Sequence, residues 1–337
     1  MKDIRNYPLL QHNTFGIDAQ CRRFIEFSTV SELMAVCTKL TPDDQPLLLL
    51  GGGSNLLLTG NFDGTVLHSA IMGVEKMVEE GESVFVRVGS GENWDDFVAF
   101  CVENGWYGAE NLSLIPGEVG ASAVQNIGAY GVEAKDIIER VEAVEIQTGR
   151  RVTFENEECD YAYRQSRFKH DWKNRFVVTH VIFRLSTEFQ PRLDYGNLRE
   201  TMQKKGVPVT PQTLRQTIID IRREKLPDPK EIGSAGSFFM NPMVSMQKYR
   251  ELAAKFPEMP HYEVDSDRVK IPAGWMIDQC GWKGRSLGRA GVYEKQALEL
   301  VNLGGATGAE ILHLCETIRA DVRQKFGIDI HLEVNIV

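Results

Sequence analysis

The sequence predicts an α+β protein built from more than one domain. Short runs with the pattern of strands occur along the whole chain of 337 residues, among amphipathic segments that open on helix caps. This length suits two or three domains. The composition changes after Pro242, and we therefore expect a domain boundary just before residue 227.

The first part of the chain is expected to hold a strand, a helix and a second, buried strand. Residues 22–27 alternate enough for a strand. Thr29 and Glu32 have the spacing of a capping box ahead of a helix. Residues 47–50 are all leucine, an apolar run of the kind found in buried strands.

The buried strand leads directly into a loop of small residues at positions 51–55. Glycine lets a backbone approach a ligand closely, and successive N–H groups can bind a phosphate. The spacing matches neither GxGxxG nor the P-loop, and on these residues alone an ordinary turn is an equal alternative. The loop consists of Gly51, Gly52, Gly53, Ser54 and Asn55.

A second glycine-rich stretch, residues 111–131, follows an expected strand at 84–88 and an expected helix from Asn93 to Gly105. Its small side chains would let the backbone wrap a flat cofactor, although a packing seam is the alternative. Groups suited to ligand contacts are present at Gln125, Asn126 and Tyr130.

Basic and aromatic residues gather in the segment 159–169, between expected strands at 137–146 and 176–185. The segment contains Arg164 and Lys169 beside two tyrosines. In a protein of net charge −9 such a cluster could face an anion, and a solvated surface is the more common explanation.

The helix that starts at Thr210-Pro211 ends in cations and opens into a loop with a candidate catalytic group. Arg222 and Lys225 suit the negative end of the helix dipole. The loop KLPDPKEIGSAGSFFMNP follows, with Ser237 directly before two phenylalanines. A hydroxyl among apolar rings can be a proton donor, so Ser237 is a candidate for that role; a Gly/Ser turn is the alternative.

The C-terminal part is expected to end in a helix and a strand. Thr307 with Glu310 opens a helix that runs through Phe326. Residues 331–337 alternate, so that a strand returning to the N-terminal sheet would present Glu333 on the face opposite its apolar residues. A solvent-facing glutamate on an edge strand is the alternative.

Composition excludes several classes of protein. The acidic balance argues against a general nucleic-acid or membrane-surface binder. Six scattered cysteines without a CxxC pair favour reduced thiols and no metal site. The N-terminus lacks the apolar region of a signal peptide, and no apolar run approaches the ~20 residues that span a bilayer. We expect a cytoplasmic monomer.

The order and spacing of the motifs carry more information than any one of them. Over nearly its whole length the chain resembles the UDP-N-acetylenolpyruvoylglucosamine reductases, also called UDP-N-acetylmuramate dehydrogenases, of type I. The motifs that carry the resemblance are GSN at 53–55, IPG at 115–117, QNIGAYG at 125–131, YRQSRFK at 163–169, KLPDP at 225–229, GSFF at 236–239 with Asn241-Pro242, and GWMIDQCG at 274–281.

The resemblance implies an FAD-binding fold of the vanillyl-alcohol oxidase (PCMH) type in two subdomains, followed by an α+β substrate-binding domain. The first subdomain would cover residues 1–73 together with the strand 331–337. The second would cover residues 74–226, and the substrate domain residues 227–330.

The resemblance also implies the reaction. NADPH reduces FAD, and the flavin passes hydride to C3 of UDP-N-acetylglucosamine enolpyruvate, which gives UDP-N-acetylmuramate for peptidoglycan synthesis. Ser237 would deliver the proton to C2, with Arg164 and Glu333 polarising the substrate. A flavin oxidase of the same fold, acting on a sugar or alcohol, is the alternative.

The binding residues that the resemblance implies fall into two sets. FAD contacts are expected at residues 51–55 and at Pro116, Gly117, Gly120, Ala121, Ser122, Val124, Gln125, Asn126, Gly128, Ala129, Tyr130 and Val178. Substrate contacts are expected at Tyr195, Arg222, Lys225, Asn241, Tyr262 and Gln296. The chain departs from the family pattern at Met240, Leu332 and Asn335.

Overall fold

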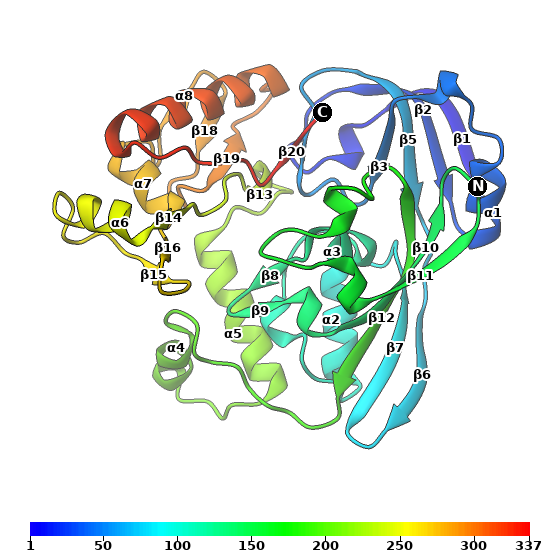
Figure 1. Ribbon diagram of the computed structural model, residues 1–337, viewed down its shortest axis with the longest axis horizontal. Coiled ribbons are helices and arrows are strands. Elements are labelled where there is room, and N and C mark those ends of the chain that lie inside the picture. The colour runs from blue at the N-terminus through cyan, green and yellow to red at the C-terminus, as the bar shows by residue number, and fades with distance from the viewer. The chain divides into compact units, whose positions relative to one another are not determined.

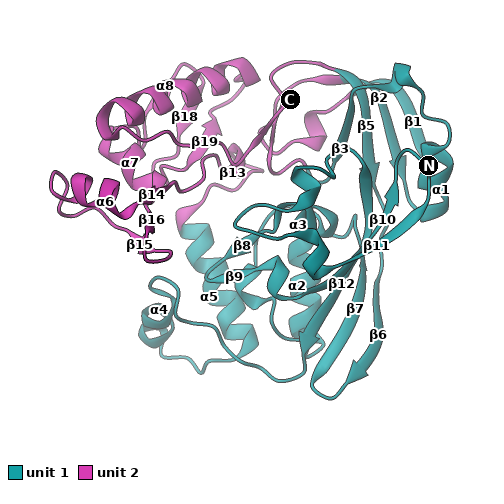
Figure 2. Ribbon diagram, in the orientation of Figure 1, with its two compact units in different colours: residues 1–7, 21–52, 63–224 teal, residues 8–20, 53–62, 225–337 magenta.

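The computed structural model describes residues 1–337 and divides into two compact units (Figure 2). Unit 1 comprises residues 1–7, 21–52 and 63–224, and unit 2 comprises residues 8–20, 53–62 and 225–337. Unit 2 is therefore the C-terminal third of the chain with two short N-terminal segments added. Helices and strands mix in both units, which confirms the α+β class. The three-part division at residues 73 and 226 stays a prediction.

A five-stranded antiparallel sheet is the main element of unit 1, and β12 (Phe176–Ser186) lies at its centre. The expected strands at 84–88, 137–146 and 176–185 are all in this sheet. Figure 1 shows α2 (Trp94–Glu103) and α3 (Val119–Gln125) beside it. Its order is β11 (Arg151–Glu155), β10 (Ile138–Glu145), β12, β7 (Ser83–Gly89) and β6 (Val74–Glu80).

The core of this sheet explains where α2 lies. Asn93 caps the helix as expected, because its side chain accepts a hydrogen bond from the Asp96 N–H. Trp94 and Phe97 then point inward and meet Phe183 of β12, with ring centroids 5.8 and 4.8 Å away. These aromatic contacts hold α2 against the sheet.

A four-stranded sheet, mostly in unit 1, leads into the first glycine-rich loop, whose residues 53–55 are assigned to unit 2. Thr29 caps α1 (Val30–Cys37) as the sequence predicts. β3 (Leu47–Leu50) pairs in parallel with β5 (Phe62–Ser69), and this register sets Leu50 opposite His68. The order is β1 (Lys2–Pro8), β2 (Gln20–Phe27), β5, β3. The loop therefore begins beside His68.

The rest of unit 1 is formed by short helices and a hairpin. α5 (Pro211–Lys225) buries an apolar face that packs against α4 (Leu198–Lys205). The hairpin consists of β8 (Gly128–Ala129) and β9 (Val132–Glu133). Short 3-10 helices in the chain are Leu10–His12, Pro42–Asp44, Glu110–Leu112, Ala134–Asp136, Asn156–Cys159 and Arg167–Lys169.

Unit 2 has two small antiparallel sheets and three helices. The long helix α8 (Gly308–Phe326) opens on the expected Thr307–Glu310 capping box and ends at Gly327. The four-stranded sheet has the order β13 (Gly233–Ser237), β19 (Glu299–Asn302), β18 (Ala290–Val292), β17 (Ser286–Leu287). The other elements are β14 (Met243–Ser245), β16 (Arg268–Lys270), β15 (Tyr262–Glu263), α6 (Met246–Ala253) and α7 (Ala273–Gln279).

The C-terminal strand is shorter than the alternating pattern predicts. Only Asn335–Ile336 (β20) forms a strand, and it pairs in parallel with β4 (Leu56–Leu57) rather than joining the four-stranded sheet of unit 1. Val334 is 4% exposed but Ile336 is 36% exposed, so the expected apolar face is not continuous. The segment does return to an N-terminal part of the chain.

None of the helices is both long and apolar enough to cross a lipid bilayer. All six cysteines are free thiols, and all but Cys280 are buried.

Candidate active site

Ser237 ends β13 at a bulge in the ladder with β19. Ser234 pairs with Val301 and Ser237 pairs with Glu299, so three steps along β13 oppose two along β19. Gly236 supplies a φ of +72°, which glycine adopts without strain. Bulges re-aim the side chains that follow them. Ser237 itself is half-buried, and the rings of Phe238 and Phe239 after it are fully buried.

The last segment of the chain lies antiparallel to the residues after Ser237. The Glu333 N–H donates to the Phe238 carbonyl at 2.9 Å, and Phe239 forms a bridge with Leu332. The Met240 N–H in turn donates to the His331 carbonyl at 2.9 Å. Two of the predicted catalytic residues, Ser237 and Glu333, are thus on neighbouring segments of unit 2.

The same segment holds Asn55, the last residue of the first glycine-rich loop. The backbone and side-chain amides of Asn335 both donate to the Asn55 carbonyl, at 3.2 and 3.1 Å. The Asn55 side chain donates to the Glu333 carbonyl at 3.3 Å. Asn335, a departure from the family pattern, therefore has a structural function next to the predicted cofactor loop.

Arg164, the third predicted catalytic residue, belongs to unit 1 and is oriented by backbone contacts. Its φ of +57° lies in a tight turn closed by reciprocal hydrogen bonds between Ala162 and Gln165. The guanidinium donates to the Gly128 carbonyl at 2.6 Å and to the Asn126 carbonyl at 3.4 Å. The structure thus joins Arg164 to the second glycine-rich stretch.

Three further predicted site residues meet in unit 1. The rings of Tyr130 and Tyr195 are in edge-to-face contact, with centroids 6.3 Å apart. Arg222 is held by a hydrogen bond from Nε to the Leu114 carbonyl at 3.2 Å. Burial raises the pKa of Tyr130, and the charge of Arg222 opposes that rise. A residue expected to bind cofactor therefore lies with two expected to bind substrate.

Part of the second glycine-rich stretch is engaged in packing within unit 1. A Cβ at Gly120 would lie 2.7 Å from Cβ of Ser90, so only glycine fits there. The Asn126 side-chain amide donates to Glu133 and Ala162 and accepts from the Lys135 N–H, and its backbone N–H donates to the Ser122 carbonyl, so Asn126 is engaged within the protein. Also engaged internally are the Ser122 hydroxyl and the Val124 carbonyl.

The first glycine-rich loop keeps two backbone donors available. No hydrogen bond within the protein uses the N–H of Gly52 or Gly53. Gly53 is buried with a φ of +63°, and a Cβ there would lie 2.0 Å from the His12 carbonyl oxygen. Adjacent unpaired N–H groups on glycine are the donor set that a diphosphate takes, and they fit the diphosphate of FAD.

The sequence interpretation missed an ionic cluster beside this loop in unit 1. Nδ1 of His68 lies 3.2 Å from Glu26 Oε2, and its Nε2 lies 3.3 Å from Glu118 Oε1. Burial would lower the pKa of His68, but Glu118 and Glu26 outweigh it and raise that pKa. A Cβ added at Gly51 would lie 3.3 Å from Glu118 Oε2, so the carboxylate is close to the start of the loop. A histidine directly after the apolar pair Val66-Leu67 was the available signal.

The remaining predicted substrate residues belong to unit 2 and differ in exposure. Lys225 is exposed, and Tyr262 is 49% exposed on β15. Asn241 accepts from the Ala273 N–H at 2.9 Å and Gln296 from the Leu298 N–H at 3.3 Å, so both also order the backbone. In unit 1, Val178 is buried on β12.

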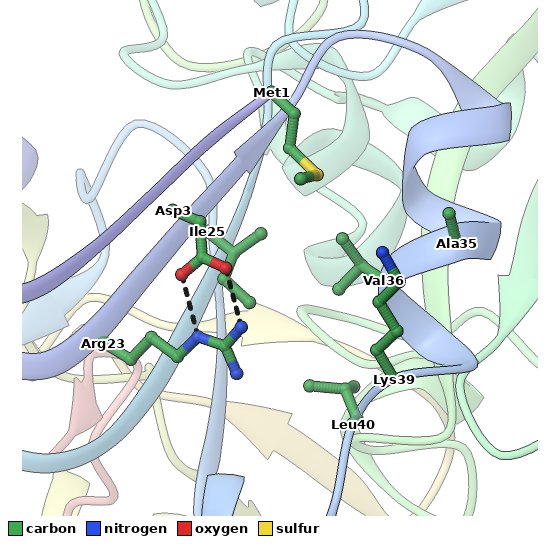
Figure 3. A pocket seen from close by; sticks show the side chains of 8 residues that line it. All are labelled: Met1, Asp3, Arg23, Ile25, Ala35, Val36, Lys39 and Leu40. Carbon is green, nitrogen blue, oxygen red and sulfur yellow. Dashed lines mark hydrogen bonds and ion pairs between the residues drawn. The ribbon is translucent and has the colours of Figure 1, made fainter.

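A separate pocket in unit 1 contains none of the predicted site residues (Figure 3). Asp3 and Arg23 form a bidentate ion pair at one side of the pocket, with Nε–Oδ1 and Nη2–Oδ2 distances of 2.8 and 2.7 Å. Its lining is Met1, Asp3, Arg23, Ile25, Ala35, Val36, Lys39 and Leu40.

Comparison with known proteins identifies both parts of the chain. A family model described as "FAD binding domain" matches residues 22–155, and one described as "UDP-N-acetylenolpyruvoylglucosamine reductase, C-terminal domain" matches residues 228–337. The UDP-N-acetylenolpyruvoylglucosamine reductase of Bacteroides fragilis is 55% identical over 335 residues, 99% of either chain. That of Porphyromonas gingivalis is 47% identical over 336 residues, again 99% of either chain.

A solved structure shows the same fold. The crystal structure of UDP-N-acetylenolpyruvylglucosamine reductase from Thermus caldophilus matches with a TM-score of 0.68 and 23% identity, covering 99% of this chain and 98% of the other. The expected FAD-binding fold with an added α+β domain is therefore confirmed. The chain belongs to the UDP-N-acetylenolpyruvoylglucosamine reductase family, and it is a flavin-dependent oxidoreductase whose cofactor is FAD.

Proposed function

We propose that this chain reduces UDP-N-acetylglucosamine enolpyruvate to UDP-N-acetylmuramate in peptidoglycan synthesis, with NADPH as the reductant. Identity of 55% over the full length supports the substrate class. The hydrogen bond from Glu333 to Phe238, 2.9 Å long, is the observation that carries the assignment of residues. It joins Glu333 to the residue directly after Ser237, although the two segments are far apart in the sequence.

In this proposal both glycine-rich segments hold FAD. The backbone N–H groups of Gly52 and Gly53 would bind the diphosphate, and residues 115–131 would approach the rest of the cofactor through small side chains. When bound, FAD supplies the hydride chemistry, taking hydride from NADPH and passing it to C3 of the enolpyruvyl group. The residues of this chain supply binding, orientation and the proton.

Arg164 stabilises the charge that develops on the substrate. Hydride addition at C3 leaves negative charge at C2, which spreads into the carboxylate. A guanidinium can donate two parallel hydrogen bonds to that carboxylate. Two backbone carbonyls, of Gly128 and Asn126, already fix the orientation of Arg164, so little reorganisation is needed when charge appears. Glu333 assists in polarising the substrate.

Ser237 donates the proton that C2 needs. A serine hydroxyl is a weak acid in water, so its surroundings must favour transfer. The buried rings of Phe238 and Phe239 keep water from one side of the hydroxyl. Exclusion of water disfavours the charged alkoxide, so a nearby cation is needed to stabilise it, and Lys225 and Arg222 are the candidates.

The substrate brings the charges of a diphosphate and a carboxylate, and the proposed contacts supply cations and hydrogen-bond donors. Lys225 and Tyr262 would bind near the diphosphate, and both side chains are exposed. The other contacts proposed are Tyr195, Arg222, Asn241 and Gln296.

An anaerobic experiment tests the reaction. NADPH should bleach the yellow holoenzyme, and UDP-N-acetylglucosamine enolpyruvate should restore the colour. A protein that stays bleached after the substrate is added would refute the proposed activity.

Ser237→Ala tests the proton donor. Bleaching by NADPH should persist, while the return of colour should slow by roughly 10²-fold or more. Ser286→Ala, which alters an exposed serine of the same unit, is the control. Equal loss of both half-reactions would contradict a proton-donor role.

A further inference from the structure

A buried carboxylate lies beneath the bulge that carries Ser237. The Ser234 hydroxyl donates to Glu299 Oε2 at 2.8 Å, and each residue is only 2% exposed. Glu299 begins β19 and is followed there by the buried, apolar Leu300 and Val301. Burying a carboxylate costs free energy unless it is hydrogen-bonded. The buried pair of Ser234 and Glu299 therefore indicates a structural or functional role.

The pair spans the irregular part of the ladder. Glu299 is the strand partner of Ser237, and Ser234 is the last regularly paired residue before the bulge. The Ser234 oxygen also accepts from the Gly236 N–H at 3.2 Å. Because the single hydroxyl hydrogen goes to Glu299, a lone pair of the oxygen remains for Gly236.

On its other side, β13 is held by hydrogen bonds between Ser234 and Thr14. The Ser234 N–H donates to the Thr14 carbonyl at 3.0 Å, and the Thr14 hydroxyl donates to the Ser234 carbonyl at 2.5 Å. Ser234 is thus held at its backbone by Thr14 and at its side chain by Glu299. Gly236 is the only residue of the bulge with a positive φ, and it directly precedes Ser237.

We propose that Glu299 and Ser234 are positioning residues that hold the Gly236 peptide and so aim the Ser237 hydroxyl at the substrate. The inference rests on the proposed role of Ser237 as proton donor. A glycine peptide without this support can rotate, and small misplacements of a reacting group cost much of its rate. Nothing in the bulge other than this pair fixes the Gly236 N–H through a side chain.

Half-reaction kinetics test the inference. In Ser234→Ala, bleaching by NADPH should be unchanged, and reoxidation by substrate should fall by about tenfold or more. Glu299→Leu should show the same selective loss. Glu299→Gln keeps a side-chain oxygen as acceptor and should retain most of the rate. Hydrogen exchange at the Gly236 amide should accelerate in the first two variants only.

The double variant separates positioning from general destabilisation. If Glu299 acts through Ser234, then Ser234→Ala with Glu299→Leu should lose no more rate than either change alone. Thr307→Ala, which removes a capping hydroxyl of α8 in the same unit, is the stability control and should change neither half-reaction. Multiplied rate losses, or equal slowing of both half-reactions, would overturn the inference.

A parallel measurement on Ser237→Ala distinguishes the two proposals. If Ser237→Ala leaves reoxidation intact, the assignment of the proton donor is wrong. If Ser237→Ala slows reoxidation and Ser234→Ala does not, only the positioning role is wrong.

Discussion

The backbone N–H of Glu333 donates to the carbonyl oxygen of Phe238 at 2.9 Å, which joins the last segment of the chain to the residue after Ser237. The contact uses the backbone of both residues, so the side chain of Glu333 is not needed to form it. Structure and chemistry can therefore be separated at this position by mutation.

Glu333→Gln should leave the fold intact and slow the reaction with substrate. We expect the free energy of unfolding to change little, because the hydrogen bond to Phe238 remains. Reoxidation of the bleached enzyme by substrate should slow by about 10²-fold. Stopped-flow absorbance measures this rate, with Glu316→Gln, an exposed glutamate paired to Arg319, as control. Wild-type reoxidation in Glu333→Gln would argue against a catalytic role.

Arg164→Lys should impair the same half-reaction although it preserves the charge. Arginine donates to the Gly128 and Asn126 carbonyls through its planar guanidinium and, in the proposed function, also to the substrate carboxylate. Lysine lacks this planar set of donors. We expect a loss of about 10² in the rate of reoxidation by substrate. Arg167→Lys is the matched control, since that arginine pairs with Asp171 and is not among the predicted site residues. Equal effects of the two changes would contradict the assignment.

His68 should make unfolding dependent on pH. Burial lowers its pKa, but Glu118 and Glu26 outweigh burial and raise it. Lys2, near Glu26, is the other charged group of this cluster. A raised pKa in the folded protein means that the stabilisation is complete below the unfolded value of about 6.5 and is lost as pH rises through the folded value.

Urea unfolding of wild type and His68→Gln tests this dependence. The difference in unfolding free energy should be larger at pH 6 than at pH 9. His313→Gln, at an exposed position of α8, serves as the control. A difference that grows toward pH 9 would show that the cluster is not held by a protonated His68.

His180 should give the opposite pH dependence of stability, with stability lost as pH falls. Burial, and then the charge of Arg87, lower its pKa to about 4, while Glu142 opposes them. Arg87 Nη2 lies 3.0 Å from Nδ1, which must therefore be the acceptor. The folded protein resists protonation here, so stability is lost as pH falls below about 6.5, by about 3 kcal/mol once pH reaches 4.

Unfolding at pH 7 and pH 4.5 measures the effect. His180→Gln can still accept from Arg87 but cannot take up a proton, so it should lose less unfolding free energy than wild type over this interval. Equal losses in the two proteins would place the acid sensitivity elsewhere.

Local sequence patterns were enough to predict most of the longer helices and strands. Thr29, Asn93 and Thr307 cap helices where the sequence indicates, because a cap depends on residues within one turn. The apolar run 47–50 is a strand for a similar reason. The alternation at 331–337 predicted too long a strand, because its pairing depends on a distant partner, β4.

The sequence by itself determined the family, the FAD cofactor and the capped helices, since motifs and caps are local. Only the tertiary structure decided that Glu333 lies against Phe238 and that Glu299 lies beneath the bulge at Ser237. Ser234 and Glu299 are 65 positions apart, and Asn55 and Glu333 are 278 apart. Contacts at such separations are set by how strands pair and pack, which no local pattern encodes.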